Sequence, residues 1–460
     1  MKRNKKRQNK KRRYKKKQML SKRMIIIFVF MIAILAFAYY IFTNKNHKST
    51  SVDAFSSIDK IVEIIETNTY ANINRYIVYG THFNLEGNIE IYEDPSSIES
   101  AEIVAKKVSG EEIGIDTEYT YENHQLSFST LKEINTGLDL ESLHVEDYYI
   151  LLKVQFLNDE TKYYSLRNDT EYGNIEYYTL TRNHTNNRIY MDFATINNMP
   201  ILGFHITTVN ELPDNVYDVV IDPGHGGSDV GAVNGRYMES EIALDCALEL
   251  KEQLEMIGLK VLLTRNGTES EEEYTMYNIY DEDGRVTMAN ESHAKILISL
   301  HLNSNLSDNV DGGVEIYASS NSDLTFAKKL ADDIVTTANT PYSTNQTDKV
   351  EDGVYVRTIE VEDQKNETSF SRENYKGIFD SIPYLYIIRE IGGIATGAFV
   401  DGTNKAYAAN EYRNSNIGVE GFLVELGYIN VDEDLENILE NSNLYAQAIT
   451  NSIVNFYEIK

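Results

Sequence analysis

The stretch VVIDPGHGG, residues 219–227, decides the fold of the larger part of this chain. Its first three residues are β-branched and apolar, which is typical of a buried strand, and a Pro-Gly turn ends the run. His225 therefore stands directly after a strand. Two similar strands follow downstream, ILISLH, which ends in His301, and GFLVE, which ends in Glu425. We expect the three side chains to meet at one site.

Strands and helices alternate around these motifs. Residues 240–258 carry apolar side chains at helical spacing, and Gly258 suits the end of that helix. A strand is expected over residues 260–265 and a further helix over residues 323–338. This alternation predicts an α/β fold with a mostly parallel sheet flanked by helices. In such sheets ligands bind at the carboxyl ends of the strands, where the three motif side chains fall.

A different pattern precedes this domain. Residues 58–210 contain short runs rich in β-branched and aromatic residues, and Asn, Asp and Gly turns separate the runs. We expect a mostly β accessory domain here, most simply a sandwich, with a short amphipathic helix at residues 59–67. The segment ELPDN, residues 211–215, is the expected junction to the α/β domain at residues 217–460.

Charge is divided sharply along the chain. The first 48 residues hold 16 Lys or Arg and no acidic residue, whereas the remainder holds 27 Lys or Arg against 71 acidic residues. A body this anionic does not favour nucleic acid as a partner. Cys246 is the single cysteine, so the chain forms no internal disulfide.

The N-terminal region predicts a membrane anchor. Residues 24–42 are 19 residues without a charge, a length that spans the ~30 Å hydrocarbon core, and they follow the basic segment 1–23. The positive-inside rule places residues 1–23 in the cytoplasm and the body outside, with residues 43–57 as a linker. The alternative is a secreted protein, cleaved near Ala38, because AFA at residues 36–38 resembles a signal-peptidase site.

The three strand-end side chains suggest a catalytic zinc site. Such a site usually has three His or carboxylate ligands and one position for water. His225 and His301 are two candidates, and Glu239 is the third, because the glycine-rich loop after His225 allows the chain to fold back. Glu425 is then better suited to act as a general base than as a fourth ligand, which would close the site.

Four further residues are weaker candidates. Asp222 is placed to orient the His225 imidazole from behind. Asn303 projects to the same side of its segment as His301 and is a candidate substrate contact. Arg389 is either a substrate contact or a structural ion-pair partner, and Arg265 is expected to be structural.

These residues carry a family resemblance. The motifs, in chain order, are VVIDPGHGG (219–227), Glu239, SLHLNSN (299–305), GGVEIY (312–317) and FLVELGYINVDED (422–434). Together they resemble the zinc-dependent N-acetylmuramoyl-L-alanine amidases of the Amidase_3 type over about residues 217–460. The resemblance implies that His225, Glu239 and His301 bind one Zn²⁺, that Glu425 is catalytic, and that the substrate is peptidoglycan, cleaved between N-acetylmuramic acid and L-alanine.

The chain also departs from compact members of that family. Residues 392–420 look like extra material before the last strand. This insertion is expected either to cover the zinc or to shape the substrate groove. Two other functions stay open: a zinc peptidase that acts within the stem peptide, and a non-catalytic wall-binding or divisome protein. The sequence identifies no protein activator. The acidic residues between 269 and 283 are expected to form a solvated loop.

Overall fold

Three seven-stranded sheets organise the part of the chain that the computed structural model describes. That part comprises residues 59–66, 69–92, 97–131, 136–170, 173–268, 284–304, 311–320, 322–360, 381–391 and 417–459. The predicted basic segment, anchor and linker, the acidic loop at 269–283 and most of the 392–420 insertion lie outside these residues. No helix within the described ranges is both long and apolar enough to cross a membrane.

Two of the sheets form the predicted β-rich region. The first has the order β10-β1-β2-β6-β5, with β7 beside β2 and β24 beside β1. Its strands are β1 (Ala71–Tyr79), β2 (His82–Glu90), β5 (Glu118–Glu122), β6 (Gln125–Ser129), β7 (Leu138–Asp139), β10 (Leu166–Asn168) and β24 (Ile417–Gly418). The second has the order β11-β12-β13-β8-β3-β4, with β9 beside β8. Its strands are β3 (Ile98–Lys107), β4 (Glu112–Ile115), β8 (Asp147–Phe156), β9 (Thr161–Tyr164), β11 (Ile175–Tyr178), β12 (Asn186–Ile196) and β13 (Met199–Val209).

Both sheets contribute to one apolar core, so this region is a sandwich. Phe83 of the first sheet meets Phe204 of the second edge to face, with ring centroids 5.1 Å apart. Such aromatic pairs add to the hydrophobic stabilisation of a core. The helix expected at residues 59–67 is reduced to α2 (Asp59–Val62), because Ile65 instead forms a parallel bridge with Tyr163 of β9.

The third sheet carries the sequence motifs and has the order β17-β14-β18-β25-β19-β21-β20. Its strands are β14 (Val219–Pro223), β17 (Val261–Leu263), β18 (Ile296–Asn303), β19 (Glu315–Ala318), β20 (Lys349–Glu351), β21 (Val354–Tyr355) and β25 (Glu420–Tyr428). Two small hairpins accompany it, formed by β15 (Val233–Asn234) with β16 (Tyr237–Met238) and by β22 (Thr358–Glu360) with β23 (Ser381–Pro383). The pairings from β17 to β25 are parallel, whereas β19 runs antiparallel to β25.

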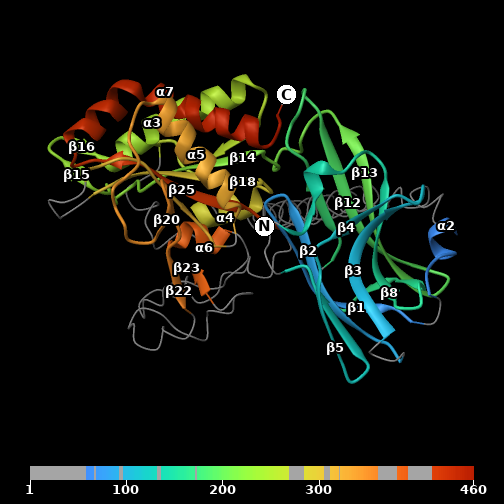
Figure 1. Ribbon diagram of the computed structural model, residues 1–460. Coiled ribbons are helices and arrows are strands. Elements are labelled where there is room, and N and C mark those ends of the chain that lie inside the picture. Colours follow the sequence, from blue (N-terminus) through green and yellow to red (C-terminus); the bar gives the residue numbers. More distant parts are fainter. Residues whose placement is uncertain are drawn as a thin grey trace, which may run out of the picture. The chain divides into compact units, whose positions relative to one another are not determined.

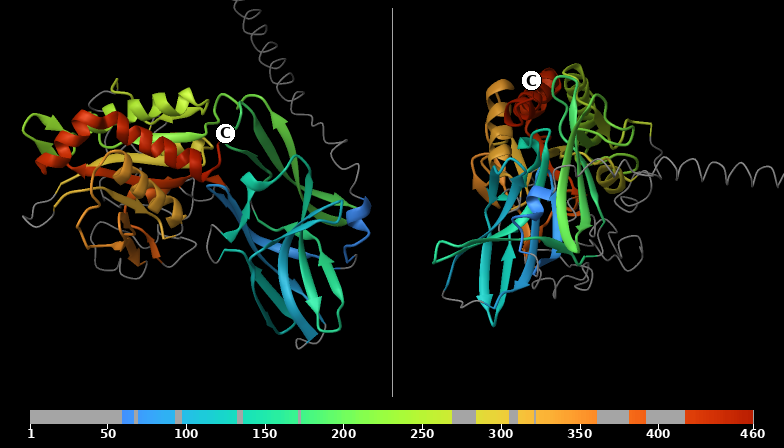
Figure 2. Two further views of the ribbon diagram at one scale, coloured as in Figure 1. Left: turned by 45° about the horizontal axis from the view of Figure 1, so that its top comes forward. Right: turned by 90° about the vertical axis from the view of Figure 1, so that its right-hand side faces the viewer.

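Helices cover both faces of this third sheet (Figure 1). One face packs against α3 (Glu239–Met256), α5 (Leu324–Thr337) and α7 (Asp432–Phe456). Figure 2 shows α7 lying beside α3. The other face packs against α4 (Arg285–Glu291) and α6 (Tyr386–Ile391). The predicted α/β architecture with a mostly parallel, helix-flanked sheet is therefore confirmed.

Single residues explain where α3 ends and where α5 begins. Gly258 has φ +89° directly after α3, the left-handed conformation in which glycine ends helices without strain. The Asp323 carboxylate accepts a hydrogen bond of 2.8 Å from the backbone N–H of Thr325 and so caps α5. Cys246 is buried on the apolar side of α3, as expected of a core residue.

The β-rich region and the third sheet are joined by more than the predicted junction. Residues Lys60–Lys460 form one compact unit. Strand β24 pairs with β1, and the Gly80 N–H donates to the Gly418 carbonyl over 2.9 Å. Because β24 directly precedes β25, the strand that carries Glu425 starts at an edge of the accessory sandwich.

A buried polar network forms a second connection. The Glu141 carboxylate, on a side chain only 5 % exposed, accepts hydrogen bonds from the Tyr177 hydroxyl over 2.7 Å and from the Arg182 guanidinium over 2.8 Å. Arg182 also donates to the Tyr457 carbonyl after α7, over 2.7 Å. The Thr181 N–H donates to Asp218, one residue before β14. Paired buried charges of this kind are costly to break, so they resist separation of the two regions.

Glu420 is a third connection and is buried at the start of β25. Its carboxylate accepts a hydrogen bond of 2.6 Å from the Asp323 N–H at the start of α5. It also lies against Gly80 at the end of β1, where an added Cβ would come within 3.0 Å of Glu420 Oε2. Burial, together with the nearby Asp323 charge, raises the pKa of Glu420 from 4.5 to about 7.

This shift predicts a pH-dependent stability that Glu420→Gln removes. The folded protein binds the Glu420 proton more tightly than the unfolded chain, so stability is greatest below pH 4.5 and falls as pH rises to about 7. At about 1.36 kcal/mol per pH unit, the unfolding free energy of the native protein should fall by about 2–3 kcal/mol relative to Glu420→Gln over this range. Urea unfolding at a series of pH values measures it. Glu252→Gln, an exposed change on α3, is the control, and parallel curves for Glu420→Gln and the native protein would contradict the prediction.

Candidate metal centre

His225 stands in a tight turn directly after β14. It has φ +59°, a left-handed conformation that is uncommon for a residue with a side chain and typical of functional turns. The Gly224 N–H donates to the Leu300 carbonyl over 2.8 Å, which ties the turn to β18. A Cβ at position 224 would come within 2.4 Å of the His301 ring. Glycine at 224 therefore lets the two histidines approach each other.

Glu239 begins α3 and reaches back toward both histidines. The loop between His225 and Glu239 contains the β15–β16 hairpin and returns the chain to the end of β14. The Ala232 N–H donates to Glu239 Oε2 over 2.8 Å, and the Leu302 N–H donates to Oε1 over 3.1 Å. Gly231 passes so close that an added Cβ would lie 2.6 Å from both Glu239 and His225.

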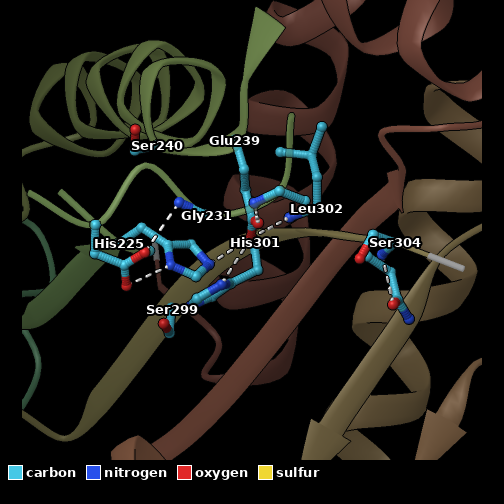
Figure 3. A network of polar contacts seen from close by, with 12 residues as sticks. His225, Gly231, Glu239, Ser240, Ser299, His301, Leu302 and Ser304 are labelled. Atoms are coloured by element: carbon cyan, nitrogen blue, oxygen red, sulfur yellow. Dashed lines mark hydrogen bonds and ion pairs between the residues drawn. The ribbon is translucent and has the colours of Figure 1, made fainter. Parts of the chain in front are cut away.

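The three predicted ligands converge in the structure (Figure 3). Glu239 Oε1 lies 3.0 Å from His225 Nε2 and 3.0 Å from His301 Nδ1, and one ligand atom from each residue lies within 4.8 Å of the others. Burial alone would raise the pKa of Glu239, but hydrogen bonds from the two imidazoles hold it well below its usual range. A carboxylate and two imidazoles that converge in this way are a donor set that suits a divalent cation.

Asp229 takes the position behind His225 that we predicted for Asp222. The Asp229 Oδ2 atom lies 2.9 Å from His225 Nδ1, and a backbone bridge between Gly226 and Asp229 closes the loop. A carboxylate on the second nitrogen leaves Nε2 free to bind a metal and fixes the ring orientation. The motif HGGSD places Asp229 four residues after the histidine. A pattern based on strands alone favours Asp222 for the same role.

Asp222 is fully buried and has a structural role, so the prediction that it orients His225 is wrong. It accepts hydrogen bonds of 2.6 Å from the Thr264 hydroxyl and 2.6 Å from the Ser299 hydroxyl, and it pairs with Arg285. The left-handed turn at His225 carries the imidazole away from the strand residue. Arg285 also donates to the His225 carbonyl over 2.6 Å. Asp222 thus anchors the turn indirectly, because Arg285 connects its carboxylate to the backbone carbonyl of His225.

Arg265 holds the same turn from the other side. It is buried after β17, and its guanidinium donates to the carbonyls of Pro223, Gly224 and Ser240 at 2.9, 2.9 and 2.6 Å. These contacts join the end of β14 to the start of α3, the two points from which His225 and Glu239 project. The structure therefore gives Arg265 the structural role that its position predicts, with backbone carbonyls among its partners.

Glu425 lies beside the three predicted ligands. It is directly opposite His301 on the parallel strand β18 and opposite Glu315 on the antiparallel strand β19. Its Oε2 atom is shielded from solvent and has no hydrogen-bond partner among the described residues. Burial, and then the charges of Glu239 and Glu315, raise the pKa of Glu425 well above its usual range. A carboxyl group in this setting is suited to gain and lose a proton.

The two predicted substrate contacts differ in outcome. Arg389 is 1 % exposed, and its guanidinium donates to the carbonyls of Pro383 and Tyr384 before α6, so it supports a turn and the predicted substrate contact is wrong. Asn303 is partly exposed near the site, and its amide donates to Glu315 over 3.0 Å. A substrate contact by Asn303 stays a prediction. Glu315 itself stands in the quoted motif GGVEIY, but nothing in its spacing indicated a role.

Comparison with known proteins confirms the family resemblance. Residues 219–371 match the family described as N-acetylmuramoyl-L-alanine amidase. The range includes His225, Glu239 and His301, whereas Glu425 lies beyond it.

Individual relatives match over parts of their length. A germination-specific N-acetylmuramoyl-L-alanine amidase of Bacillus subtilis is 33 % identical over 111 residues, which are 23 % of this chain and 47 % of that protein. The amidase LytC of the same organism is 29 % identical over 143 residues, 31 % of this chain and 27 % of that protein. The chain thus spans less than half the length of each of these relatives. Among solved structures, the amidase AmiC2 of Nostoc punctiforme aligns with a TM-score of 0.34 and 21 % identity, over 53 % of this chain and 98 % of that one.

The contact behind His225 predicts a measurable effect on metal affinity. Asp229→Asn keeps the size of the side chain but removes its charge, so the imidazole should become a weaker ligand. We expect zinc affinity to fall about 10–100-fold, as for other outer carboxylates. Competition with a chromophoric chelator measures the affinity. Asp245→Asn, an exposed change on α3, is the matched control, and equal affinity in the two variants would contradict the role given to Asp229.

Proposed function

We propose that this chain is a zinc-dependent N-acetylmuramoyl-L-alanine amidase that hydrolyses the amide between N-acetylmuramic acid and L-alanine in peptidoglycan. The convergence of His225, Glu239 and His301 on one point, with Glu425 on the neighbouring strand, carries the proposal. The family match over residues 219–371 supports the same reaction.

In the proposed site, His225, Glu239 and His301 would hold one Zn²⁺. When bound, zinc would polarise a carbonyl and lower the pKa of a water molecule to about 7. The donor set fits because a catalytic zinc site has three such ligands and keeps a position open. Asp229 orients His225, and the Ala232 and Leu302 N–H groups fix the Glu239 carboxylate.

Glu425 is the proposed proton carrier. It takes a proton from the attacking water and returns it to the leaving nitrogen of L-alanine, a role that requires both protonation states. Its uncompensated burial favours the protonated form, and a nearby dication favours the carboxylate.

Digestion of purified peptidoglycan tests the reaction. The full-length protein should release stem peptides with a new L-alanine amino terminus, and a chelator should abolish this release. Mass spectrometry of the fragments separates this outcome from cleavage within the stem peptide, which would favour the zinc peptidase. A purified protein with neither zinc nor hydrolysis would favour the non-catalytic wall-binding function.

Substitution of Glu425 separates proton transfer from metal binding. Glu425→Ala should lose at least 10²-fold in kcat, the usual contribution of a general acid and base, while zinc content stays near one per chain. His225→Ala should lose both the zinc and the activity. Metal analysis and the same fragment assay measure the two properties, and full activity in Glu425→Ala would contradict the mechanism.

We further propose that residues 24–42 anchor the protein in the membrane with residues 1–23 in the cytoplasm and the enzyme outside. The uncharged length and the basic flank support this topology. The intact mass of the mature protein distinguishes an anchor from cleavage near Ala38. Deletion of residues 1–42 should move an anchored protein from the membrane fraction to the soluble fraction.

A further inference from the structure

A second polar cluster lies on β19, beside Glu425. Its centre is Glu315, which is fully buried and directly opposite Glu425 in the sheet. Glu315 accepts hydrogen bonds from the Tyr317 hydroxyl over 2.8 Å, from the Asn303 amide over 3.0 Å and from the Tyr428 hydroxyl. Nothing in the proposed proton transfer requires this cluster, although it borders the same site.

The chemistry of Glu315 sets the direction of these hydrogen bonds. Its two oxygens accept from the Tyr317 and Tyr428 hydroxyls and from the Asn303 amide, which are all able to donate. Burial and then the Glu315 charge raise the pKa of Tyr317, so the phenol keeps its one proton and directs it at Glu315. The Tyr317 oxygen therefore has only lone pairs left for any other partner.

Exposure and existing hydrogen bonds together select Tyr317 from among the three donors. Tyr428 is 2 % exposed and Asn303 uses its carbonyl oxygen to accept from the Ser304 N–H over 2.8 Å. Tyr317 is partly exposed, and its ring lies against Tyr355 with centroids 5.3 Å apart, which limits its rotation. Tyr317 lies two residues from Glu315 along β19, so its side chain is on the face of the sheet that also carries Glu425 on the neighbouring strand.

We propose that the Tyr317 oxygen accepts a hydrogen bond from a peptide amide N–H of the substrate and that Glu315 is the positioning residue that turns this oxygen into a fixed acceptor. The inference rests on the proposed amidase function and adds a contact with the leaving peptide. Sugar hydroxyls rotate and can donate or accept, whereas an amide N–H can only donate and gains most from a fixed acceptor. The scissile nitrogen must receive a proton beside Glu425, so the next N–H along the peptide is the expected partner.

A binding cycle with two ligands tests this contact. The ligands are muramyl dipeptide, N-acetylmuramoyl-L-alanyl-D-isoglutamine, and the same compound methylated on the nitrogen that joins its two amino acids. Full-length protein with Glu425→Gln serves as the background, so that the ligand is not hydrolysed. Tyr317→Phe should weaken binding of the parent compound about 5–10-fold and binding of the methylated compound less than about 2-fold.

Glu315→Gln extends the same cycle. A glutamine amide can donate to Tyr317 and free the hydroxyl proton to point outward, so the preference for the parent compound should be lost although the ring remains. Tyr342→Phe is the matched control, because the Tyr342 hydroxyl donates to Asp332 on α5. It should leave both affinities unchanged. Tyr317→Phe should keep the zinc content and the melting temperature of the background protein.

Three results overturn the inference: an equal loss for both ligands in Tyr317→Phe, no loss for either, or no measurable binding of the parent compound. Failure of the proposed function has a different signature, since the wild-type protein would then release no L-alanine amino terminus from peptidoglycan. The two proposals can therefore fail separately.

Discussion

Backbone hydrogen bonds between β14, β18 and β25 fix the positions of His301 and Glu425 and of the turn that carries His225. In this register Pro223 lies beside Leu300, and His301 lies beside Glu425. The alternation of a strand then places His301 and Glu425 on the same face. A slip by one residue would turn one of them into the opposite core. The apolar residues that build the core thus also set the strand register, and this register aligns His301 with Glu425.

Much of this arrangement can be predicted from the sequence because its causes are local. The β-branched run before Asp222 predicts β14, and apolar spacing with Gly258 predicts α3. What the sequence could not provide depends on contacts between distant segments. The antiparallel direction of β19 and the pairing of β24 with β1 are such contacts. The choice of Asp229 over Asp222 follows from the left-handed backbone at His225, which a strand-based pattern does not reveal.

Carboxylates on the third sheet differ in how many hydrogen-bond partners they have. The difference distinguishes those with a structural role from the one proposed to transfer a proton. Asp222 has three partners and Glu315 has three donors, so the oxygens of both carboxylates are hydrogen-bonded. Glu425 stands next to Glu315, with an oxygen that has no partner among the described residues. An unpaired buried polar group costs about 1–3 kcal/mol. Retaining that cost beside the three converging candidate ligands is typical of a group kept for reaction rather than for stability.

The accessory sandwich is attached where it constrains this chemistry. Strand β24 extends the first sheet and leads directly into β25, and Glu420 is enclosed between Gly80 of the sandwich and the start of α5. The Glu141 network fixes the end of α7 and the approach to β14 from the same region. A sandwich bound at these points cannot swing on a linker without disturbing the start of the strand that carries Glu425. Its contribution to the candidate site is therefore to hold that strand, whatever surface its outer faces meet.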